Sequence, residues 1–515
     1  MVPRLSLGLG NRRFDASAPR TPPRPPERAA AYTERVPARR PRLVPAGAHD
    51  ALIESLARLR DDLELPTGFP AEVEAEARRA AQSVPIDPPA AQLDDLRDIE
   101  FLTIDPAGST DLDQALHLER TATGAVLHYA IADLPAFVTP DGAIDDEARL
   151  RGQTLYAADG RIPLHPVALS EDAASLLPDR DRRAFVWRFV LDDGARPLET
   201  TLRRAVIRSR AQWSYVDAQA VIDAGTAPPS LDALAWFGPL RLEREAERGG
   251  ASLNVPETRI VADDGGHRLE RDAPLAIEDW NAQVSLLTGM AAADIMLEGR
   301  VGILRTMPAA EADDVAAFRA QTVALGIPWP ADLSYGDYLR GLERDSPAAL
   351  AILDAAAGLF RGAGYAAFDG APPADPLQAA IGAPYAHTTA PLRRLVDRWS
   401  LVICEALANG REVPVWARES LASLPKIMAR SDGVANRLGA ATVDRVEAAL
   451  LSGHEGQVFE AVVLGLRGDG ARVQLMDPPV TAKVAGLDAA AGATVRLRLE
   501  SVDIDSGTVV LEHSE

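Results

Sequence analysis

Between residues 95 and 453 the chain places strand-like segments first and helix-like segments later, and this order constrains the fold more than any other feature. The strand-like segments are Ile99–Ile104, Ala115–Glu119, Val126–Ala132, Ala184–Leu191 and Thr200–Ser209. Apolar residues at helical spacing then mark Leu231–Arg248, Ile277–Leu297, Ala310–Leu325, Pro347–Phe360 and Ala390–Ala408. Segregated strands and helices predict an α+β fold rather than a strictly alternating parallel sheet.

The segments on either side of this region have a different composition. Residues 1–45 carry ten Arg against three acidic residues and many Pro, which predicts a basic, disordered tail. Residues 46–94 contain two helical patterns. Residues 454–515 predict a small OB-fold barrel, because five short strand patterns are separated there by Gly, Asp and Pro turns. These strand patterns are Gly456–Leu466, Ala471–Leu475, Thr481–Ala485, Thr494–Val502 and Thr508–Leu511.

Bulk composition limits the class of protein. The 515 residues are 47% apolar and 25% charged, which is typical of globular chains long enough for two or three domains. No run of eighteen apolar residues occurs and Cys404 is the only cysteine, so we expect no membrane span, no internal disulfide and a cytoplasmic location. The net charge of −21 argues against a surface that coats nucleic acid throughout, although a local basic channel is compatible with it.

The polar loop from Ile104 to Gln114 lies between two predicted strands and carries Asp105, Asp111 and Asp113. Carboxylates this close repel one another, so they favour either water or a hard cation such as Mg²⁺ between them. The alternative is an ordinary solvated turn, because Asp, Gly, Ser and Pro are common turn residues. The loop alone leaves both interpretations open.

From this loop onward the sequence resembles the RNase II/RNase R (RNB) family of exoribonucleases. The motifs occur in the family's order over roughly 350 residues, and the C-terminal OB-fold prediction matches the RNA-binding barrel that usually ends these enzymes. They are Thr103–Asp105 with Asp111 and Asp113, Ala130–Asp133, Arg151–Tyr156, Arg161–Pro166, Ser214–Asp217, Val255–Glu257 and Tyr385–Arg394.

The resemblance implies an RNB-type catalytic domain over 95–453 that hydrolyses single-stranded RNA from the 3′ end to nucleoside 5′-monophosphates. It also implies roles for individual residues, with one or two Mg²⁺ ions as cofactor. Asp105, Asp111 and Asp113 resemble the metal ligands, with Asp113 the least dispensable. Tyr156 resembles the aromatic that stacks on a base, and Arg393 resembles the arginine that contacts the scissile phosphate.

Two further residues leave alternatives open. Gln114 stands where the family usually has a fourth Asp; its amide oxygen could still bind a metal, but the lost charge puts a second ion in doubt. Arg394 could contact RNA or could be a structural ion-pair partner of Asp397. His387 matches a family position and receives no catalytic role.

The competing hypothesis is an RNA-binding protein of this fold with weak or lost nuclease activity. The oligomeric state stays open, with a monomer as the simplest expectation.

Overall fold

The structure is a computed structural model. It describes residues 46–86, 93–157, 160–250, 258–263, 266–271, 275–343, 346–359 and 361–514. All of these lie in one compact unit that spans residues 42–515. The predicted tail at 1–45 and the Val255–Glu257 motif fall outside the described residues. No helix in the described part of the chain combines the length and the apolar character needed to cross a membrane.

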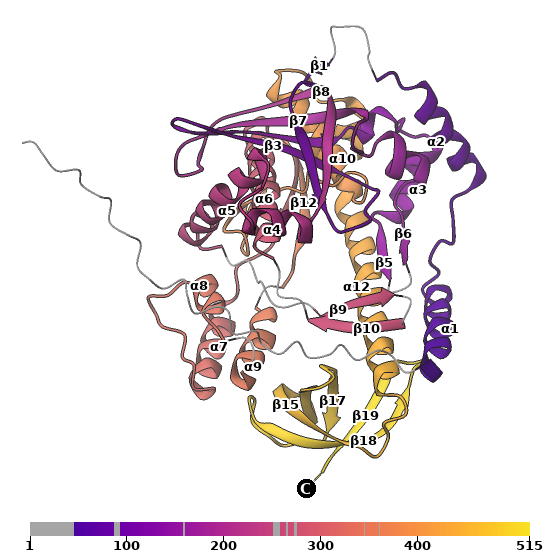
Figure 1. The fold of residues 1–515 in the computed structure, drawn as a ribbon, viewed down its shortest axis with the longest axis vertical. Coiled ribbons are helices and arrows are strands. Elements are labelled where there is room, and N and C mark those ends of the chain that lie inside the picture. The colour runs from indigo at the N-terminus through magenta and orange to yellow at the C-terminus, as the bar shows by residue number, and fades with distance from the viewer. Residues whose placement is uncertain are drawn as a thin grey trace, which may run out of the picture. The chain divides into compact units, whose positions relative to one another are not determined.

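A six-stranded sheet is the centre of this unit and has the order β1-β8-β2-β3-β4-β7 (Figure 1). The last part of β8 pairs in parallel with β2, and its first part pairs with β7, so the pairing closes into a ring. The strands are β1 (Asp94–Asp95), β2 (Phe101–Asp105), β3 (Gln114–Thr121), β4 (Gly124–Ala132), β7 (Asp181–Leu191) and β8 (Pro197–Ser214).

The two faces of the sheet bury side chains of different size, because successive residues of a strand point to opposite faces. In β4, Leu127, Tyr129 and Ile131 join the larger apolar cluster, whereas Ala130 and Ala132 join a second one. The same division holds in β7, with Phe185, Trp187 and Phe189 on the first face and Ala184 and Val186 on the second. The face with the bulkier side chains therefore packs against the helices of the larger apolar cluster.

These helices include α5, α6 and α10, whose buried residues belong to the larger cluster, while α2 and α3 contribute to the cluster on the other face. The helices up to α6 are α1 (Ala46–Asp62), α2 (Ala71–Ser83), α3 (Ala143–Arg151), α4 (Tyr215–Asp223), α5 (Pro229–Glu247) and α6 (Ala276–Gly299). The later helices are α7 (Ala312–Ala324), α8 (Tyr335–Arg340), α9 (Pro347–Ala357), α10 (Leu395–Ala408), α11 (Val415–Ser420) and α12 (Leu424–Leu451).

Small two-stranded sheets and short helices complete the region before the barrel. The two-stranded sheets pair β5 (Leu155–Ala157) with β6 (Gly160–Ile162), β9 (Thr258–Asp263) with β10 (Gly266–Arg271), β11 (Val301–Thr306) with β12 (Gly364–Asp369) and β13 (Leu377–Gln378) with β14 (Ala383–Pro384). The single-turn elements are η1 (Leu134–Ala136), η2 (Leu169–Ala173) and η3 (Leu421–Ser423).

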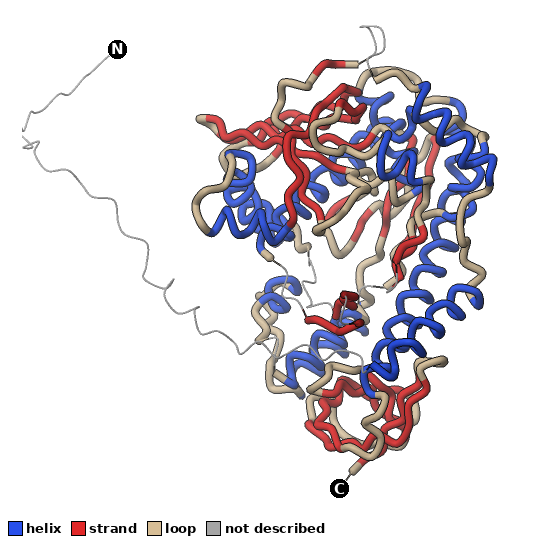
Figure 2. The backbone as a smooth tube through the Cα atoms, turned by 45° about the vertical axis from the view of Figure 1, so that its right-hand side comes forward, coloured by secondary structure: helices blue, strands red, loops and turns tan. Residues whose placement is uncertain are grey.

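Five strands after α12 form the C-terminal barrel, which Figure 2 shows as a ring beside the C-terminus. They run in the order β17-β16-β15-β18-β19, and β17 also contacts β19, so the sheet is nearly closed. Their bounds are β15 (Val458–Arg467), β16 (Gly470–Leu475), β17 (Thr481–Ala485), β18 (Thr494–Asp503) and β19 (Thr508–His513). This architecture confirms the predicted α+β fold with a small OB-type barrel.

Two parts of the helical prediction need correction. The prediction started a helix at Ala390, but α10 begins at Leu395, because Arg394 has an extended backbone that bridges Gln153 and the Leu395 N–H donates to the carbonyl oxygen of Gly152 (3.0 Å). The longest helix, α12, was not predicted. Its C-terminal part packs against α1 and reaches the barrel, so its apolar residues face several partners rather than forming one stripe.

Candidate active site

The loop between β2 and β3 is fixed by backbone and hydroxyl contacts on both sides. The backbone N–H of Leu112 donates to Ser175 Oγ (2.9 Å), and Ser175 Oγ donates to the carbonyl oxygen of Thr110 (2.7 Å). The N–H of Leu176 donates in turn to the carbonyl oxygen of Leu112 (2.9 Å). Since β2 ends at Asp105 and β3 begins at Gln114, these contacts hold three carboxylates at one end of the sheet.

The loop before α10 docks directly onto this first loop. Asp113 is almost fully buried, and its Oδ1 accepts a hydrogen bond from the backbone N–H of Leu392 (2.7 Å) while its Oδ2 accepts one from Arg393 Nε (3.2 Å). Gln114 Nε2 donates to the carbonyl oxygen of Thr389 (2.7 Å). Two segments about 280 positions apart in the sequence therefore form one site.

The β5–β6 hairpin is the third segment that contributes to this site. The backbone N–H of Thr154 donates to the carbonyl oxygen of Arg393 (2.9 Å), which ties β5 to the α10 loop. Tyr156 pairs with Arg161 across the β5–β6 hairpin, and Arg161 forms an ion pair with Asp111. Tyr156 is 56% exposed, so its ring remains accessible to a ligand.

The negative charges of Asp105 and Asp113 are poorly compensated by other protein groups. Burial raises the pKa of Asp113 to about 7, although the Arg393 charge and the Leu392 N–H oppose that rise. The pKa of Asp105 is also raised to about 7, first by burial and further by the Asp111 charge, with Arg393 opposing. Asp105 Oδ2 is buried and has no hydrogen-bond partner among the described residues. These groups would gain from a cation.

The other two predicted metal ligands already have protein partners. Asp111 pairs with Arg161, which also contacts Glu171 (2.7 Å). The amide oxygen of Gln114 accepts a hydrogen bond from Tyr129 OH (2.8 Å), and Ser285 Oγ lies 2.8 Å from the same hydroxyl. Gln114 thus links the sheet to the α10 loop, and its role as a metal ligand stays a prediction.

The neighbouring arginines differ in what they contact. Arg393 uses Nε on Asp113, and its side chain is 45% exposed, which leaves its terminal nitrogens accessible. Arg394 binds the fully buried Asp397 through two hydrogen bonds of 3.0 and 2.9 Å. The structure thus contains the ion pair considered as the alternative for Arg394, while an RNA contact by this residue stays a prediction. His387 is half-buried, and its Nδ1 lies 2.7 Å from Tyr365 OH, which is a structural contact.

The carboxylate oxygens of this site suit a hard divalent cation, but few protein ligands are grouped around it. Carboxylate oxygens are the ligands that Mg²⁺ prefers, and the partnerless Asp105 Oδ2 faces no protein donor in the described part of the chain. Within those same residues, however, no three His, Cys, Asp or Glu side chains are grouped closely enough to hold a metal ion. A cation here would therefore take few protein ligands and complete its shell with water and substrate oxygens.

Sequence analysis assigned no role to Arg161, Tyr129 or Ser285, although all three support the site. Arg161 lay within a quoted motif, but nothing in the sequence indicates that it meets Asp111, fifty positions earlier. Tyr129 lies in an alternating apolar strand, so the pattern predicts only burial. These roles depend on tertiary contacts that spacing does not encode.

Comparison with protein families gives two matches. A family model described as "RNB domain" matches residues 93–407, and one described as "RNase II-type exonuclease C-terminal S1 domain" matches residues 457–514. Among curated proteins, the exosome complex exonuclease RRP44 of Homo sapiens is 34% identical over 179 residues. That stretch is 34% of this chain and 19% of the human protein, so it spans about a fifth of the relative's length.

Solved structures show the same fold at low identity. RNase R of Mycoplasma genitalium, in complex with ribose methylated single-stranded RNA, superposes with a TM-score of 0.80 at 18% identity, covering 90% of this chain and 78% of that one. Yeast Ssd1, described as a pseudonuclease, gives 0.64 at 15% identity, covering 87% and 58%. The fold therefore occurs in a ribonuclease and in a pseudonuclease, and the site residues must decide between them.

Proposed function

This chain belongs to the RNB family, and from that premise we propose that it is a Mg²⁺-dependent 3′→5′ exoribonuclease that degrades single-stranded RNA to nucleoside 5′-monophosphates. The observation that carries the proposal is the contact of the α10 loop with Asp113, made by the Leu392 N–H and by Arg393. This contact places a cationic phosphate-binding group beside two poorly compensated carboxyls.

Each accessible side chain of the site suits one part of the substrate. The terminal nitrogens of Arg393 are available for the oxygens of the scissile phosphate, where negative charge develops during hydrolysis. The exposed ring of Tyr156 offers a surface on which a terminal base stacks without its sequence being read. Hydrolysis then forms a bond between a water oxygen and phosphorus, breaks the bond from phosphorus to the 3′ oxygen, and protonates that oxygen.

Asp105 and Asp113 are the residues that would hold a metal most directly. Asp113 is buried and Asp105 is half-buried, and the pKa of each is raised, so binding of a cation would restore their charged form. A Mg²⁺ ion bound here would lower the pKa of the attacking water and offset charge on the phosphate. Asp111 lies at the edge of this pair through its contact with Arg161, and Gln114 fixes the loop that carries Asp113.

A second candidate function is RNA binding without hydrolysis. It is favoured by Gln114, whose neutral amide replaces a carboxylate and is hydrogen-bonded to Tyr129 and Thr389. The likeness to the pseudonuclease Ssd1 shows that the fold alone does not ensure activity. The raised pKa values of Asp105 and Asp113 argue for the nuclease, since RNA binding alone gains nothing from two poorly compensated carboxyl groups.

The test is degradation of a 5′-labelled single-stranded RNA with Mg²⁺ and with EDTA. The nuclease proposal predicts a ladder that shortens from the 3′ end and disappears with EDTA and in Asp113→Asn. The matched control is Asp146→Asn, which removes an exposed carboxylate of α3 and should leave the ladder unchanged. Intact RNA that is nevertheless shifted on a native gel would contradict hydrolysis and support the binding protein.

A further inference from the structure

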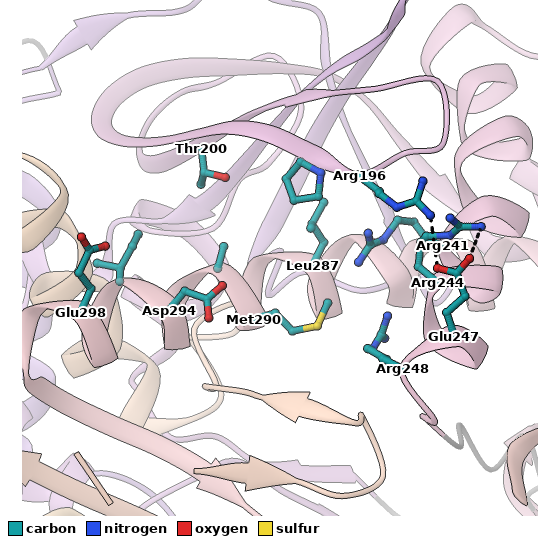
Figure 3. A pocket seen from close by; sticks show the side chains of 13 residues that line it. Arg196, Thr200, Arg241, Arg244, Glu247, Arg248, Leu287, Met290, Asp294 and Glu298 are labelled. Atoms are coloured by element: carbon teal, nitrogen blue, oxygen red, sulfur yellow. Dashed lines mark hydrogen bonds and ion pairs between the residues drawn. The ribbon is translucent and has the colours of Figure 1, made fainter. Parts of the chain in front are cut away.

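A pocket lies between the C-terminal part of α5, one face of α6 and the turn that joins β7 to β8 (Figure 3). Its volume is about 520 Å³, which is within the range of small-molecule sites. Thr200 lines it near the start of β8, whereas Ser214, at the other end of that strand, pairs with Asp105. Fourteen residues of strand correspond to roughly 45 Å of chain, so this α5–α6 pocket is separate from the candidate active site.

One end of the α5–α6 pocket is basic. Its four arginines, seen together in Figure 3, are Arg196, Arg241, Arg244 and Arg248. Glu247 forms ion pairs with Arg244 (3.0 Å) and Arg196 (3.4 Å).

The two remaining arginines have weaker compensation. Arg241 is 4% exposed and donates to the carbonyl oxygen of Ala195 (3.2 Å), but no carboxylate of the described residues forms an ion pair with it. Arg248 donates to the carbonyl oxygen of Ile381 (2.7 Å), and its nearest carboxylate, Glu245, is 4.0 Å away. Burial lowers the pKa of Arg241 to about 10; the Arg248 charge adds to this effect, and the Glu245 charge opposes it. Glu245 compensates these two arginines only in part, and the buried Arg241 Nε and Arg248 Nη2 have no hydrogen-bond partner among the described residues, so an anion would stabilise this end.

The rest of the pocket follows a single face of α6. Leu287, Met290 and Ile295 form an apolar floor, and the exposed carboxylates of Asp294 and Glu298 lie at the far end in Figure 3. Neither carboxylate makes an ion pair within the part of the chain that the structure describes. The helix rises roughly 16 Å over the eleven steps from Leu287 to Glu298, so a ligand could contact arginines at one end and free acceptors at the other.

We propose that the α5–α6 pocket binds a small organic phosphate of about nucleotide size, with its phosphate at the arginine end and N–H or O–H donors of its organic part at Asp294 and Glu298. The basic end selects a phosphate, since guanidinium groups bind its oxygens in pairs. The acidic end selects against a bare anion, because two carboxylates repel any second negative charge. This inference is independent of the proposed nuclease activity.

Isothermal titration of GMP into the full-length protein in EDTA tests the proposal, since GMP carries a phosphate at one end and N–H donors at the other. We expect saturable binding that weakens about tenfold or more in Arg248→Gln and also weakens in the surface double variant Asp294→Asn/Glu298→Gln. Arg203→Gln, which removes an exposed arginine of β8, should bind as the wild type does.

Two further comparisons separate this pocket from other anion sites. Tyr156→Ala should retain GMP binding, because Tyr156 belongs to the candidate active site. Inorganic phosphate should bind more weakly than GMP. The proposal is overturned if the wild type shows no saturable binding, if Arg248→Gln binds like the wild type, if binding is lost only in Tyr156→Ala, or if phosphate binds as tightly as GMP.

Discussion

Two groups of buried carboxylates in this protein differ in how completely their charge is compensated. Asp145 of α3 accepts hydrogen bonds from Arg398 (2.5 Å), Arg149 (3.2 Å) and the Asp141 N–H (3.0 Å). Although burial acts against it, these partners lower the pKa of Asp145. Asp113, equally buried, has only the partial compensation described above, and its pKa is raised to about 7.

Under the proposed function, this difference in compensation distinguishes a structural Asp from the Asp residues of the candidate active site. The carboxylate of Asp145 has hydrogen-bond and ion-pair partners within the protein, so it needs no ligand to compensate its charge. The charges of Asp113 and Asp105 are only partly compensated by protein groups, as expected at a site that binds a cation or a substrate. The following predictions use variants in pairs, one from each kind of environment.

The largest expected contrast is between Asp113→Asn and Asp145→Asn. Asp113→Asn should lower the rate of RNA hydrolysis by a factor on the order of 10³, with little loss of stability, because the amide keeps the Leu392 contact. Asp145→Asn should cost about 3–5 kcal/mol of unfolding free energy, because it leaves Arg398 buried without a charge partner. Rates per folded molecule and urea unfolding measure the two effects. Equal effects of both variants on both quantities would erase the distinction.

The next contrast concerns adjacent arginines. Arg393→Gln should reduce the hydrolysis rate by about 10²-fold, because it removes the accessible phosphate-binding group. Arg394→Gln should instead lower the unfolding free energy by a few kcal/mol, since Asp397 stays buried without its bidentate partner. Steady-state kinetics and thermal unfolding of both variants check this. A purely catalytic defect in Arg394→Gln would show that its RNA-contact role outweighs the ion pair.

The pH dependence of stability should differ in sign between the two environments. A raised pKa means that the metal-free folded protein binds protons more tightly than the unfolded chain, so Asp113 contributes stability at low pH that is lost as pH rises from about 4 to about 7. Asp145, with its lowered pKa, contributes stability at neutral pH that is lost on acidification.

Urea unfolding in EDTA at several pH values measures these slopes. Between about pH 4 and 7, Asp113→Asn should reduce the decline of the unfolding free energy by a few kcal/mol. The remaining decline comes from Asp105 and from Glu447, because burial raises the pKa of Glu447 to about 8. Asp145→Asn should leave that decline intact and weaken the loss of stability at acid pH. A decline of unchanged size in Asp113→Asn would contradict its raised pKa.

A smaller effect is expected at the substrate-stacking surface. Tyr156→Ala should weaken binding of single-stranded RNA about tenfold, because stacking on one base contributes about 1–3 kcal/mol. Tyr156→Phe keeps the ring and should bind nearly as the wild type does. Fluorescence anisotropy in EDTA measures both affinities without hydrolysis. Equal affinity of Tyr156→Ala and the wild type would mean that the ring does not contact the strand.

The smallest effect is expected at Gln114. In Gln114→Asp a carboxylate faces the Thr389 carbonyl and has no proton to donate, so about 1–3 kcal/mol of unfolding free energy should be lost. Tyr129→Phe removes only the hydroxyl of this network and should cost about 1 kcal/mol. If Gln114→Asp were as stable as the wild type and also bound Mg²⁺ more tightly, Gln114 would be a substitute ligand rather than a link between loops.

The strand and helix order was predictable from the sequence, because alternating and helical patterns depend on each segment alone. The α+β fold and the OB-type barrel followed from that order. The start of α10 was wrong because a tertiary contact, the bridge between Arg394 and Gln153, keeps the backbone before Leu395 extended. The α12 helix was missed because Pro425, Gly433 and Gly439 interrupt its pattern and its apolar residues contact β5, α1 and the barrel in turn along its length.

The candidate site was predictable only as separate motifs. The acidic loop was identified from its clustered carboxylates, with a metal site and a solvated turn both open, and the Tyr385–Arg394 segment was identified through the family resemblance. The structure brings the two segments together through Asp113, Gln114 and Arg393. The partner of each residue was not predictable, because contacts such as Arg161 with Asp111 or Tyr129 with Gln114 depend on where strands end in space. The roles of these residues in catalysis, metal binding and RNA binding stay predictions.

The most direct test of the account is Mn²⁺ binding, used as a spectroscopic substitute for Mg²⁺, to the wild type, Asp113→Asn and Asp145→Asn, with free Mn²⁺ measured by electron paramagnetic resonance. If uncompensated carboxylates form the cation site, the wild type and folded Asp145→Asn bind the ion with similar affinity, and Asp113→Asn binds at least tenfold more weakly, as the loss of a charged ligand predicts. Equal binding by all three proteins, or none by the wild type, would contradict the claim that the acidic loop is a metal site.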